Sequence, residues 1–331
     1  MIMIKVAVIY GGMSTEHDVS MVSAQNVIEN LNAGKYDIYK IEIAKNGEWL
    51  NNGKKIKNVV EILQKMDVVF PVLHGLYGED GTIQGMLEML KVPYVGCKVL
   101  ASSVCMDKVY TKYILKNAKI NQAKFVYIKN ENTYVDDDLE EMDLQNDEII
   151  DVVNKKLGFP VFVKPSNSGS SVGVTKANNG EELVRAIQTA SQYDKKILIE
   201  ETIVGKEVEC AVLGNDEVKA STVGEIISAE DFYTYDAKYN NSESKTVIPA
   251  LIPEKIIEEI RRCAIKAFKA VDGSGLARVD FFVEKDTNKV FLNEINTMPG
   301  FTEISMYPKL WEASGISYSE LLDELIKLAL Q

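Results

Sequence analysis

Three oxygen-bearing side chains near the end of the chain have the types and the spacing of a magnesium site. Asp280 lies in the strand-like run Leu276 to Val283, in which the charged side chains are Arg278 and Asp280. Glu294 and Asn296 are two residues apart after an apolar run, so on a strand they point the same way. Carboxylate and amide oxygens suit Mg²⁺, which leaves its other positions to phosphate and water. The spacing predicts a phosphate-handling site; alternatively, Asp280 and Arg278 form a structural ion pair and Asn296 begins an ordinary turn.

A second chemical centre is the serine- and glycine-rich loop in the stretch 158–174. A strand pattern ends at Lys164, and the loop that follows contains Gly169, Ser170 and Ser171. Small side chains let backbone N–H groups and hydroxyls reach phosphate oxygens, and Lys164 can reach the same phosphates from the side. The lysine precedes the loop, so this is not the P-loop sequence. A flexible surface loop is the alternative, against which a lysine within an otherwise apolar strand argues.

Four polar side chains elsewhere are further candidates. Glu16 follows a glycine turn and could orient an ammonium group, or it could only favour a helix N-terminus. His74 follows a strand end, where α/β sheets bind ligands, or it is a satisfied structural histidine. Glu200 and Glu207 could accept hydrogen bonds from the amino group and ribose of a nucleotide, or they are surface hairpin charges.

A long polar segment is predicted to cover the site. The stretch 228–245 has three tyrosines in place of a strand pattern, and long loops inside compact domains are commonly lids or binding loops. Lys238 and Tyr239 are its best candidates for reaching the site.

Alternating strand and helix patterns must position these residues. Strands at 4–10, 36–43 and 67–73, with helices near 57–65 and 82–90, predict an α/β domain at the start of the chain.

The remaining chain continues with longer elements. A helical pattern over 101–115 carries Lys108 and Lys112, either of which could lie on a solvated face. The acidic stretch 129–147 is expected to be surface linker without chemistry. Strands at 197–200 and 207–213 are expected to form an antiparallel pair. Helices are expected at 180–191, 254–270 and 318–330.

The composition limits the class of protein. The 331 residues carry 37 basic and 49 acidic side chains, a net charge of −12, and are 46% hydrophobic. This is typical of a globular protein of two or three domains, and it argues against a nucleic-acid or membrane surface. Four cysteines without metal or redox spacing indicate reduced thiols of a cytoplasmic protein, and two histidines argue against zinc. The apolar start predicts a first strand and not a leader or a membrane span.

A series of motifs follows one another along the chain: GGMSTEHDVS, HGLYGEDGTIQG, MDKVYTK, KPSNSGSSVG, the pair KY at 238–239, ARVDFF and NEINTMPGFTEISMYP. Together they resemble the D-alanine:D-alanine ligase family of the ATP-grasp fold, over essentially the whole chain. The resemblance implies a mixed α/β and α+β fold: a Rossmann-like parallel-sheet domain at 1–97, then a two-lobed ATP-grasp fold with lobes at 98–190 and 191–331.

By position, the resemblance implies a role for each candidate. For ATP, Lys108 and Lys164 match the phosphate lysines, Glu200 and Glu207 match the adenine- and ribose-side carboxylates, and Gly169, Ser170 and Ser171 match the loop over the phosphates. Asp280, Glu294 and Asn296 match the metal ligands, and Arg278 matches the cation at the reacting centre. Glu16, His74, Gly300, Ser305 and Met306 match the surroundings of the substrates, and Lys238 and Tyr239 match the closing loop. Among these, Glu16, Ser170, Lys238, Tyr239, Arg278 and Gly300 are the expected catalytic group. The resemblance also implies that Lys238 binds ATP and, with Lys164, spreads the charge of the transferring phosphoryl group.

The resemblance also implies the reaction. Two D-alanines would be joined for peptidoglycan precursors through an acyl phosphate, with ATP and two Mg²⁺ ions, which Mn²⁺ can replace, in a cytoplasmic homodimer. Relatives that join D-alanine to D-serine or D-lactate resemble the chain in every ATP motif. Tyr239 favours the dipeptide, whereas a small pocket discriminates weakly against the one added hydroxyl of D-serine. Thr202 departs from the family at a position where some members carry an aromatic residue near adenine.

Overall fold

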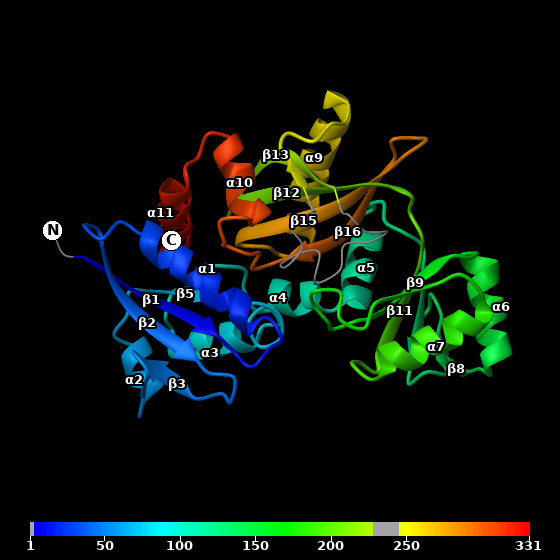
Figure 1. The fold of residues 1–331 in the computed structure, drawn as a ribbon, viewed down its shortest axis with the longest axis horizontal. Coiled ribbons are helices and arrows are strands. Elements are labelled where there is room, and N and C mark those ends of the chain that lie inside the picture. Colours follow the sequence, from blue (N-terminus) through cyan, green and yellow to red (C-terminus); the bar gives the residue numbers. More distant parts are fainter. Residues whose placement is uncertain (1–2, 228–244) are drawn as a thin grey trace.

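The computed structural model describes residues 3–227 and 245–331, which form three sheets with their covering helices (Figure 1). The first sheet has the order β4-β3-β2-β1-β5. Its parallel strands are β1 (Ile4–Gly11), β2 (Tyr36–Ile43) and β5 (Val68–Val72), and its antiparallel edge is β3 (Trp49–Asn51) and β4 (Lys54–Lys55). The helices of this domain are α1 (His17–Asn30), α2 (Val59–Leu63) and α3 (Thr82–Leu90). The predicted α/β domain is confirmed, with a short hairpin added at its edge.

The predicted helix over 101–115 is two helices, α4 (Val99–Met106) and α5 (Lys108–Asn117). Asp107 between them has an extended backbone, with φ −91° and ψ 100°, and its side chain accepts a hydrogen bond from the Tyr110 backbone N–H. The helix is interrupted at Asp107 because this aspartate caps the start of a new helix, which the apolar spacing alone does not reveal. The break gives α5 its own N-terminus beside the candidate lysine Lys108.

The second sheet has six strands in the order β10-β9-β11-β6-β7-β8. They are β6 (Phe125–Lys129), β7 (Thr133–Val135), β8 (Glu141–Asp143), β9 (Val161–Pro165), β10 (Thr175–Ala177) and β11 (Lys196–Glu201), and α6 (Asn146–Lys156) and α7 (Gly180–Ser191) cover them. The prediction that 129–147 is mostly linker is wrong. This stretch forms β7 and β8, in which Tyr134 and Val135 are buried among exposed acidic residues.

The third sheet has the order β14-β13-β12-β15-β16. Its strands are β12 (Gly205–Gly214), β13 (Lys219–Ile227), β14 (Lys245–Val247), β15 (Gly275–Glu284) and β16 (Val290–Asn296), and its helices are α9 (Glu254–Ala270), α10 (Met306–Ala313) and α11 (Tyr318–Ala329). The predicted antiparallel pair of 197–200 with 207–213 is wrong: β11 pairs with β6 and β9, and β12 pairs with β13 and β15. The chain passes from one sheet to the next between Glu201 and Gly205.

A shared core joins the first and third sheets. Phe301, which is fully buried, makes edge contacts with Phe70 of β5 and Tyr318 of α11, with ring centroids 5.7 and 6.4 Å apart. Helix α11 also packs against α1 and β5 (Figure 1). The first domain and the end of the chain are therefore held together, and any site between them has fixed walls. The expected fold class is confirmed, and the division at 97/98 and 190/191 stays a prediction, with β11 paired in the second sheet.

Candidate active site

Two cavities meet where the three sheets come together. The larger, of about 570 Å³, lies between β9 and β11 of the second sheet and β12, β13 and β16 of the third. The smaller, of about 120 Å³, lies between the turns of the first domain and the segment that follows β16. Lys108, Ser168, Ser170, Ile226 and Glu294 line both. A ligand in the larger cavity can therefore reach the smaller one past these side chains.

Glu16 connects the first domain with the serine-rich loop. Its carboxylate, 7% exposed at the start of α1, accepts a hydrogen bond from the Ser170 hydroxyl. Gly75 has φ +69°, and a Cβ added there would lie 2.2 Å from Oε2 of Glu16. A Cβ on Gly169 would lie 3.1 Å from the same oxygen. Gly75 and Gly169 thus leave room for the Glu16 carboxylate beside the serine-rich loop. This room is needed if Glu16 and the loop belong to one site, as predicted.

His74 is a satisfied buried histidine that also lines the smaller cavity. Its Nδ1 lies 3.1 Å from the Met298 carbonyl oxygen and its Nε2 lies 3.0 Å from the Ser23 hydroxyl. Burial lowers the pKa of His74, although Glu16 acts in the opposite direction. Burial therefore favours the neutral ring. The interpretation as a satisfied structural histidine is confirmed, and a contact of His74 with substrate stays a prediction.

Glu79 is a member of the smaller cavity that sequence reasoning did not select. Its carboxylate accepts hydrogen bonds from the backbone N–H groups of Gly75 at 2.9 Å and Met298 at 3.3 Å. Burial and the neighbouring Glu16 raise the pKa of Glu79 to about 8. Its position between Gly78 and Asp80, in a turn rich in glycine, was the only signal for Glu79 in the sequence.

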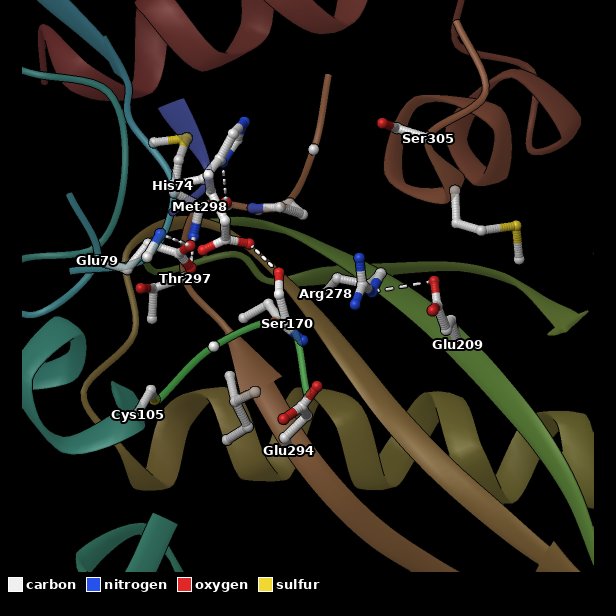
Figure 2. A pocket seen from close by; sticks show the side chains of 18 of the residues that line it. His74, Glu79, Cys105, Ser170, Glu209, Arg278, Glu294, Thr297, Met298 and Ser305 are labelled. Carbon is white, nitrogen blue, oxygen red and sulfur yellow. Dashed lines mark hydrogen bonds and ion pairs between the residues drawn. The ribbon is translucent and has the colours of Figure 1, made fainter. Parts of the chain in front are cut away.

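Arg278 sits among carboxylates at the wall of the smaller cavity (Figure 2). Its Nε and Nη2 each lie 2.7 Å from one oxygen of Asp280, and its Nε lies 2.9 Å from Glu209 Oε2. Burial alone would lower the pKa of the guanidinium, but Asp280 and Glu209 raise it well above its usual value. The ion pair foreseen as the alternative interpretation is present, and it lies at the cavity. Glu209 was missed, although it is two residues beyond Glu207 on the same strand.

The expected metal ligands share one corner of the third sheet. Asp280 is opposite Glu294 in the register of β15 and β16, and Asn296 donates a hydrogen bond to Asp280 at 2.9 Å. Asn296 ends β16 and does not begin a turn. Within 3–227 and 245–331, no group of three or more His, Cys, Asp and Glu side chains has the arrangement of a metal site. The set here is two carboxylates and an amide, of which Glu294 lines both cavities and Asn296 the smaller one, and this donor chemistry fits Mg²⁺.

The residues after β16 form the remaining wall of the smaller cavity. The hydroxyl of Ser305, which precedes α10, accepts a hydrogen bond from the Thr302 backbone N–H at 3.0 Å. A Cβ on Gly300 would lie 2.6 Å from that hydroxyl oxygen. Gly300, Ser305 and Met306 all line the smaller cavity, as the resemblance implies.

The larger cavity contains a buried carboxylate between two lysines. Glu200 is 4% exposed, and its oxygens lie 2.5 Å from the ammonium nitrogens of Lys112 and Lys164. Burial alone would raise the pKa of Glu200, but the two lysines hold it at about 2. Lys112 was noted in the sequence only as a possible solvated residue, whereas it is 3% exposed.

A buried network anchors the serine-rich loop to the start of α5. Asp107 accepts a hydrogen bond from the Ser166 hydroxyl at 2.5 Å and forms an ion pair with Lys196. The Lys108 backbone N–H donates to the Ser166 carbonyl at 3.1 Å, and the Lys108 ammonium donates to the Ser168 carbonyl at 2.5 Å. The loop and the predicted phosphate lysine Lys108 therefore hold each other in place.

The other candidates of the larger cavity come from both sheets. Ser171, Lys164 and Glu200 line it from the second sheet and its loop, and Glu207 lines it from β12 of the third. Glu200 and Glu207 thus lie on the walls of one cavity, but from different sheets. Lys238 and Tyr239 fall outside the residues that the structure describes. In the described ranges, the helices are too short or too polar to cross a membrane.

Comparison with known proteins finds matches over most of the chain. Residues 114–327 match the sequence model described as "D-ala D-ala ligase C-terminus", and residues 5–62 and 51–97 match the model of the N-terminus. A curated D-alanine--D-alanine ligase of Clostridium acetobutylicum is 51% identical, over 98% of this chain and 97% of its own length.

Two solved structures have similar folds. The D-alanine-D-alanine ligase from Coxiella burnetii has a TM-score of 0.84 at 36% identity and covers 99% of this chain and 94% of its own. VanG D-Ala:D-Ser ligase from Enterococcus faecalis has a TM-score of 0.86 at 37% identity and covers 99% and 100%.

Proposed function

Because the chain belongs to the D-alanine--D-alanine ligase family, we propose that it joins two D-alanines to D-alanyl-D-alanine with ATP, through an acyl phosphate, for peptidoglycan precursors. The observation that carries the proposal is the meeting of a larger and a smaller cavity at Lys108, Ser170 and Glu294. A phosphoryl donor in one cavity and small acceptors in the other would react at that junction.

ATP would occupy the larger cavity. Its volume of about 570 Å³ falls in the usual range for small-molecule sites, on the order of 300 to 1,000 Å³. Lys108 and Lys164 would contact the phosphates, while Glu200 would accept from the adenine amino group and Glu207 from the ribose hydroxyls. The loop residues Gly169, Ser170 and Ser171 would cover the phosphates, a role supported by the anchoring of this loop through Ser166.

Activation of the first D-alanine is a phosphoryl transfer. A carboxylate oxygen of D-alanine attacks the γ-phosphorus, and the bond from that phosphorus to the bridging oxygen of ADP breaks. Lys108 and Lys164 would bind the charged oxygens, since positioning and neutralisation dominate such a transfer. Asp280, Glu294 and Asn296 would hold Mg²⁺, as two ions or with Mn²⁺ in their place, and the metal neutralises phosphate charge when bound.

Peptide-bond formation would follow in the smaller cavity. The free amine of the second D-alanine attacks the acyl carbon, and the tetrahedral oxyanion then expels phosphate. Arg278 and the backbone N–H of Gly300 would stabilise the oxyanion. Glu16, held by Ser170 beside Gly75, would orient the ammonium of a D-alanine.

Further substrate contacts come from both walls of the smaller cavity. His74, Ser305 and Met306 would line the substrates. Lys238 and Tyr239 have the closing role that the family resemblance implies, and water exclusion protects the acyl phosphate from hydrolysis.

The intermediate can be tested by trapping. When hydroxylamine is added to the protein with ATP, Mg²⁺ and D-alanine, it should attack the acyl phosphate. The products should be D-alanine hydroxamate, ADP and phosphate. A Glu294→Gln variant should need more Mg²⁺ for the same rate, and the exposed Glu303→Gln should not. Removal of the metal with EDTA should stop ADP formation, and Mg²⁺ or Mn²⁺ should restore it. ADP formation without D-alanine-dependent hydroxamate would count against the acyl phosphate.

We also propose that the protein acts in the cytoplasm as a homodimer formed through its first domain, as the family resemblance implies. Light scattering on the eluting gel-filtration peak would report the mass of the particle. A single-chain mass at micromolar concentration would remove the dimer from the proposal.

A further inference from the structure

Glu200 is held by two lysines that differ in their surroundings. Lys112 comes from α5 and Lys164 from β9, and each ammonium lies 2.5 Å from a different oxygen of the carboxylate. The Lys112 ammonium also donates to the Ala123 carbonyl at 3.2 Å and lies 5.4 Å from the centre of the Phe125 ring. Two hydrogen-bond acceptors and an aromatic ring of the protein therefore surround this ammonium.

Only one of these lysines faces the larger cavity. The side chain of Lys164 is 16% exposed and lines the cavity together with Glu200. The side chain of Lys112 is 4% exposed and is absent from the described lining of both cavities. Lys164 can turn from Glu200 to a ligand, whereas Lys112 stays behind the carboxylate.

The three side chains carry one negative and two positive charges in a buried place. Within this trio the lysines exceed the carboxylate by one charge, so a phosphate oxygen of the proposed substrate can replace Glu200 as the partner of Lys164 while Lys112 remains with Glu200. When Lys164 turns to a phosphate, Glu200 keeps one counter-ion only if Lys112 is present. A buried carboxylate without a counter-ion takes up a proton, because burial disfavours its charged form.

We propose that Lys112 is a positioning residue, the fixed counter-ion that keeps Glu200 ionised and oriented while Lys164 binds the nucleotide phosphates. This rests on the proposed function, in which Glu200 accepts a hydrogen bond from the 6-amino group of adenine. Lys112 thereby makes the site selective for a 6-amino purine. An ionised Glu200 repels the 6-oxo group of ITP, whereas a protonated Glu200 can donate to it.

The test compares nucleotide binding in Lys112→Met, which keeps most of the length of the side chain and removes its charge, and in Lys112→Arg. Isothermal titration with ATP and with ITP, each with Mg²⁺, gives the ratio of the two affinities. Wild type should prefer ATP by about ten- to a hundredfold, as expected for one hydrogen bond to a charged group. Lys112→Met should lower this ratio about tenfold or more, and Lys112→Arg should keep most of it. The KM for D-alanine should not change.

Proton uptake separates positioning from a structural role. In Lys112→Met, ATP binding should take up a proton, so its heat should depend on the ionisation enthalpy of the buffer; in wild type it should not. Lys116→Met is the matched control, because Lys116 is on the same helix, is exposed, and pairs with Asp137 at 3.1 Å. It should behave as wild type in both measurements.

Each outcome decides one of the two claims. An unchanged ATP:ITP ratio in a folded Lys112→Met overturns the role of Lys112 while the ligase proposal stands. If this variant does not fold, Glu200→Gln carries the test, and an unchanged ratio there overturns the inference. A wild type that binds neither nucleotide overturns the proposed function itself.

Discussion

A single methyl group at Gly75 should separate the function of Glu16 from the stability of the fold. Gly75 has φ +69°, and its added Cβ would lie 2.2 Å from Glu16 Oε2. The atom that must move is the end of the side chain that accepts the Ser170 hydrogen bond. Gly53 is the matched control: its φ is +73°, and no described heavy atom lies within 4 Å of the added Cβ.

The two substitutions carry the same backbone cost. An L-residue in the left-handed region costs about 1 to 2 kcal/mol, and the loss of glycine flexibility in the unfolded chain returns about 0.4 to 1 kcal/mol. Each variant should therefore lose about 1 kcal/mol of unfolding free energy from the backbone, and Gly75→Ala should lose more to the extent that Glu16 gives up its hydrogen bond from Ser170. Gly75→Ala alone displaces Glu16, and a hydrogen bond to a charged group contributes about 1.5 to 3 kcal/mol. If that contact acts in the transition state, kcat/KM for D-alanine falls about ten- to a hundredfold.

The assay is D-alanine-dependent ADP release, with urea unfolding of the same samples and the ATP affinity as internal checks. Gly75→Ala should lose activity with an ATP affinity like that of wild type, and Gly53→Ala should keep both. Equal activity in the two variants, both folded under the assay conditions, would refute the placement of Glu16 at the substrates.

Three further predictions concern charged groups. Arg278→Ala should lower turnover about 100- to 1,000-fold while ATP affinity changes little, because the lost donor faces the oxyanion. Equal losses in the single-turnover rate and in the ATP affinity measured by titration would contradict this. The pKa of Glu200 is about 2 in the folded protein and near 4.5 in the unfolded chain, so its ion pairs stabilise the fold fully above pH 4.5. The difference in unfolding free energy between wild type and Glu200→Gln, measured by urea unfolding, should therefore narrow as the pH falls from 4.5 to 2. The pKa of Glu79 is raised to about 8, so the pH profile of kcat/KM should bend near pH 8 and lose that bend in Glu79→Gln. An identical profile would exclude Glu79 from the titration.

Local signals in the sequence located most elements correctly. The strand expected at 36–43 and the helices expected at 82–90, 180–191 and 254–270 have those bounds in the structure. These segments have strong apolar periodicity, so the side chains that mark the pattern are those that become buried. For example, Ile256, Ile260, Ala264 and Ala267 form the buried stripe of α9.

The two wrong predictions have different causes. In 129–147 the acidic residues outweigh the few apolar ones, and the strands are only three residues long, so the local pairing of β7 with β6 and of β8 with β7 leaves a weak sequence pattern. Strands β11 and β12 are separated by a short link, and adjacent strands often pair, yet they belong to different sheets. Their pairing is decided by partners distant in the sequence, β6 and β9 for β11 and β15 for β12.

The candidate site shows the same limit. The motif residues were found because their types and order are distinctive. Lys112, Glu79 and Glu209 were not selected, because each becomes important only through burial beside a residue from another element. The sequence offers two alternatives for Asp280, an ion pair with Arg278 or a metal site. The structure shows the ion pair, and it lies next to Glu294, so the pair does not exclude a metal site there.

The most direct test of the central claim is the identity of the product. Purified protein with ATP and Mg²⁺ is given D-alanine alone, and then D-alanine with an equal concentration of D-serine or D-lactate, and the products are identified by mass together with ADP. D-alanyl-D-alanine as the only product in all mixtures is the predicted result. A mixed dipeptide or a depsipeptide would assign the chain to the D-serine or D-lactate branch, and no product from any D-amino acid would contradict the ligase function.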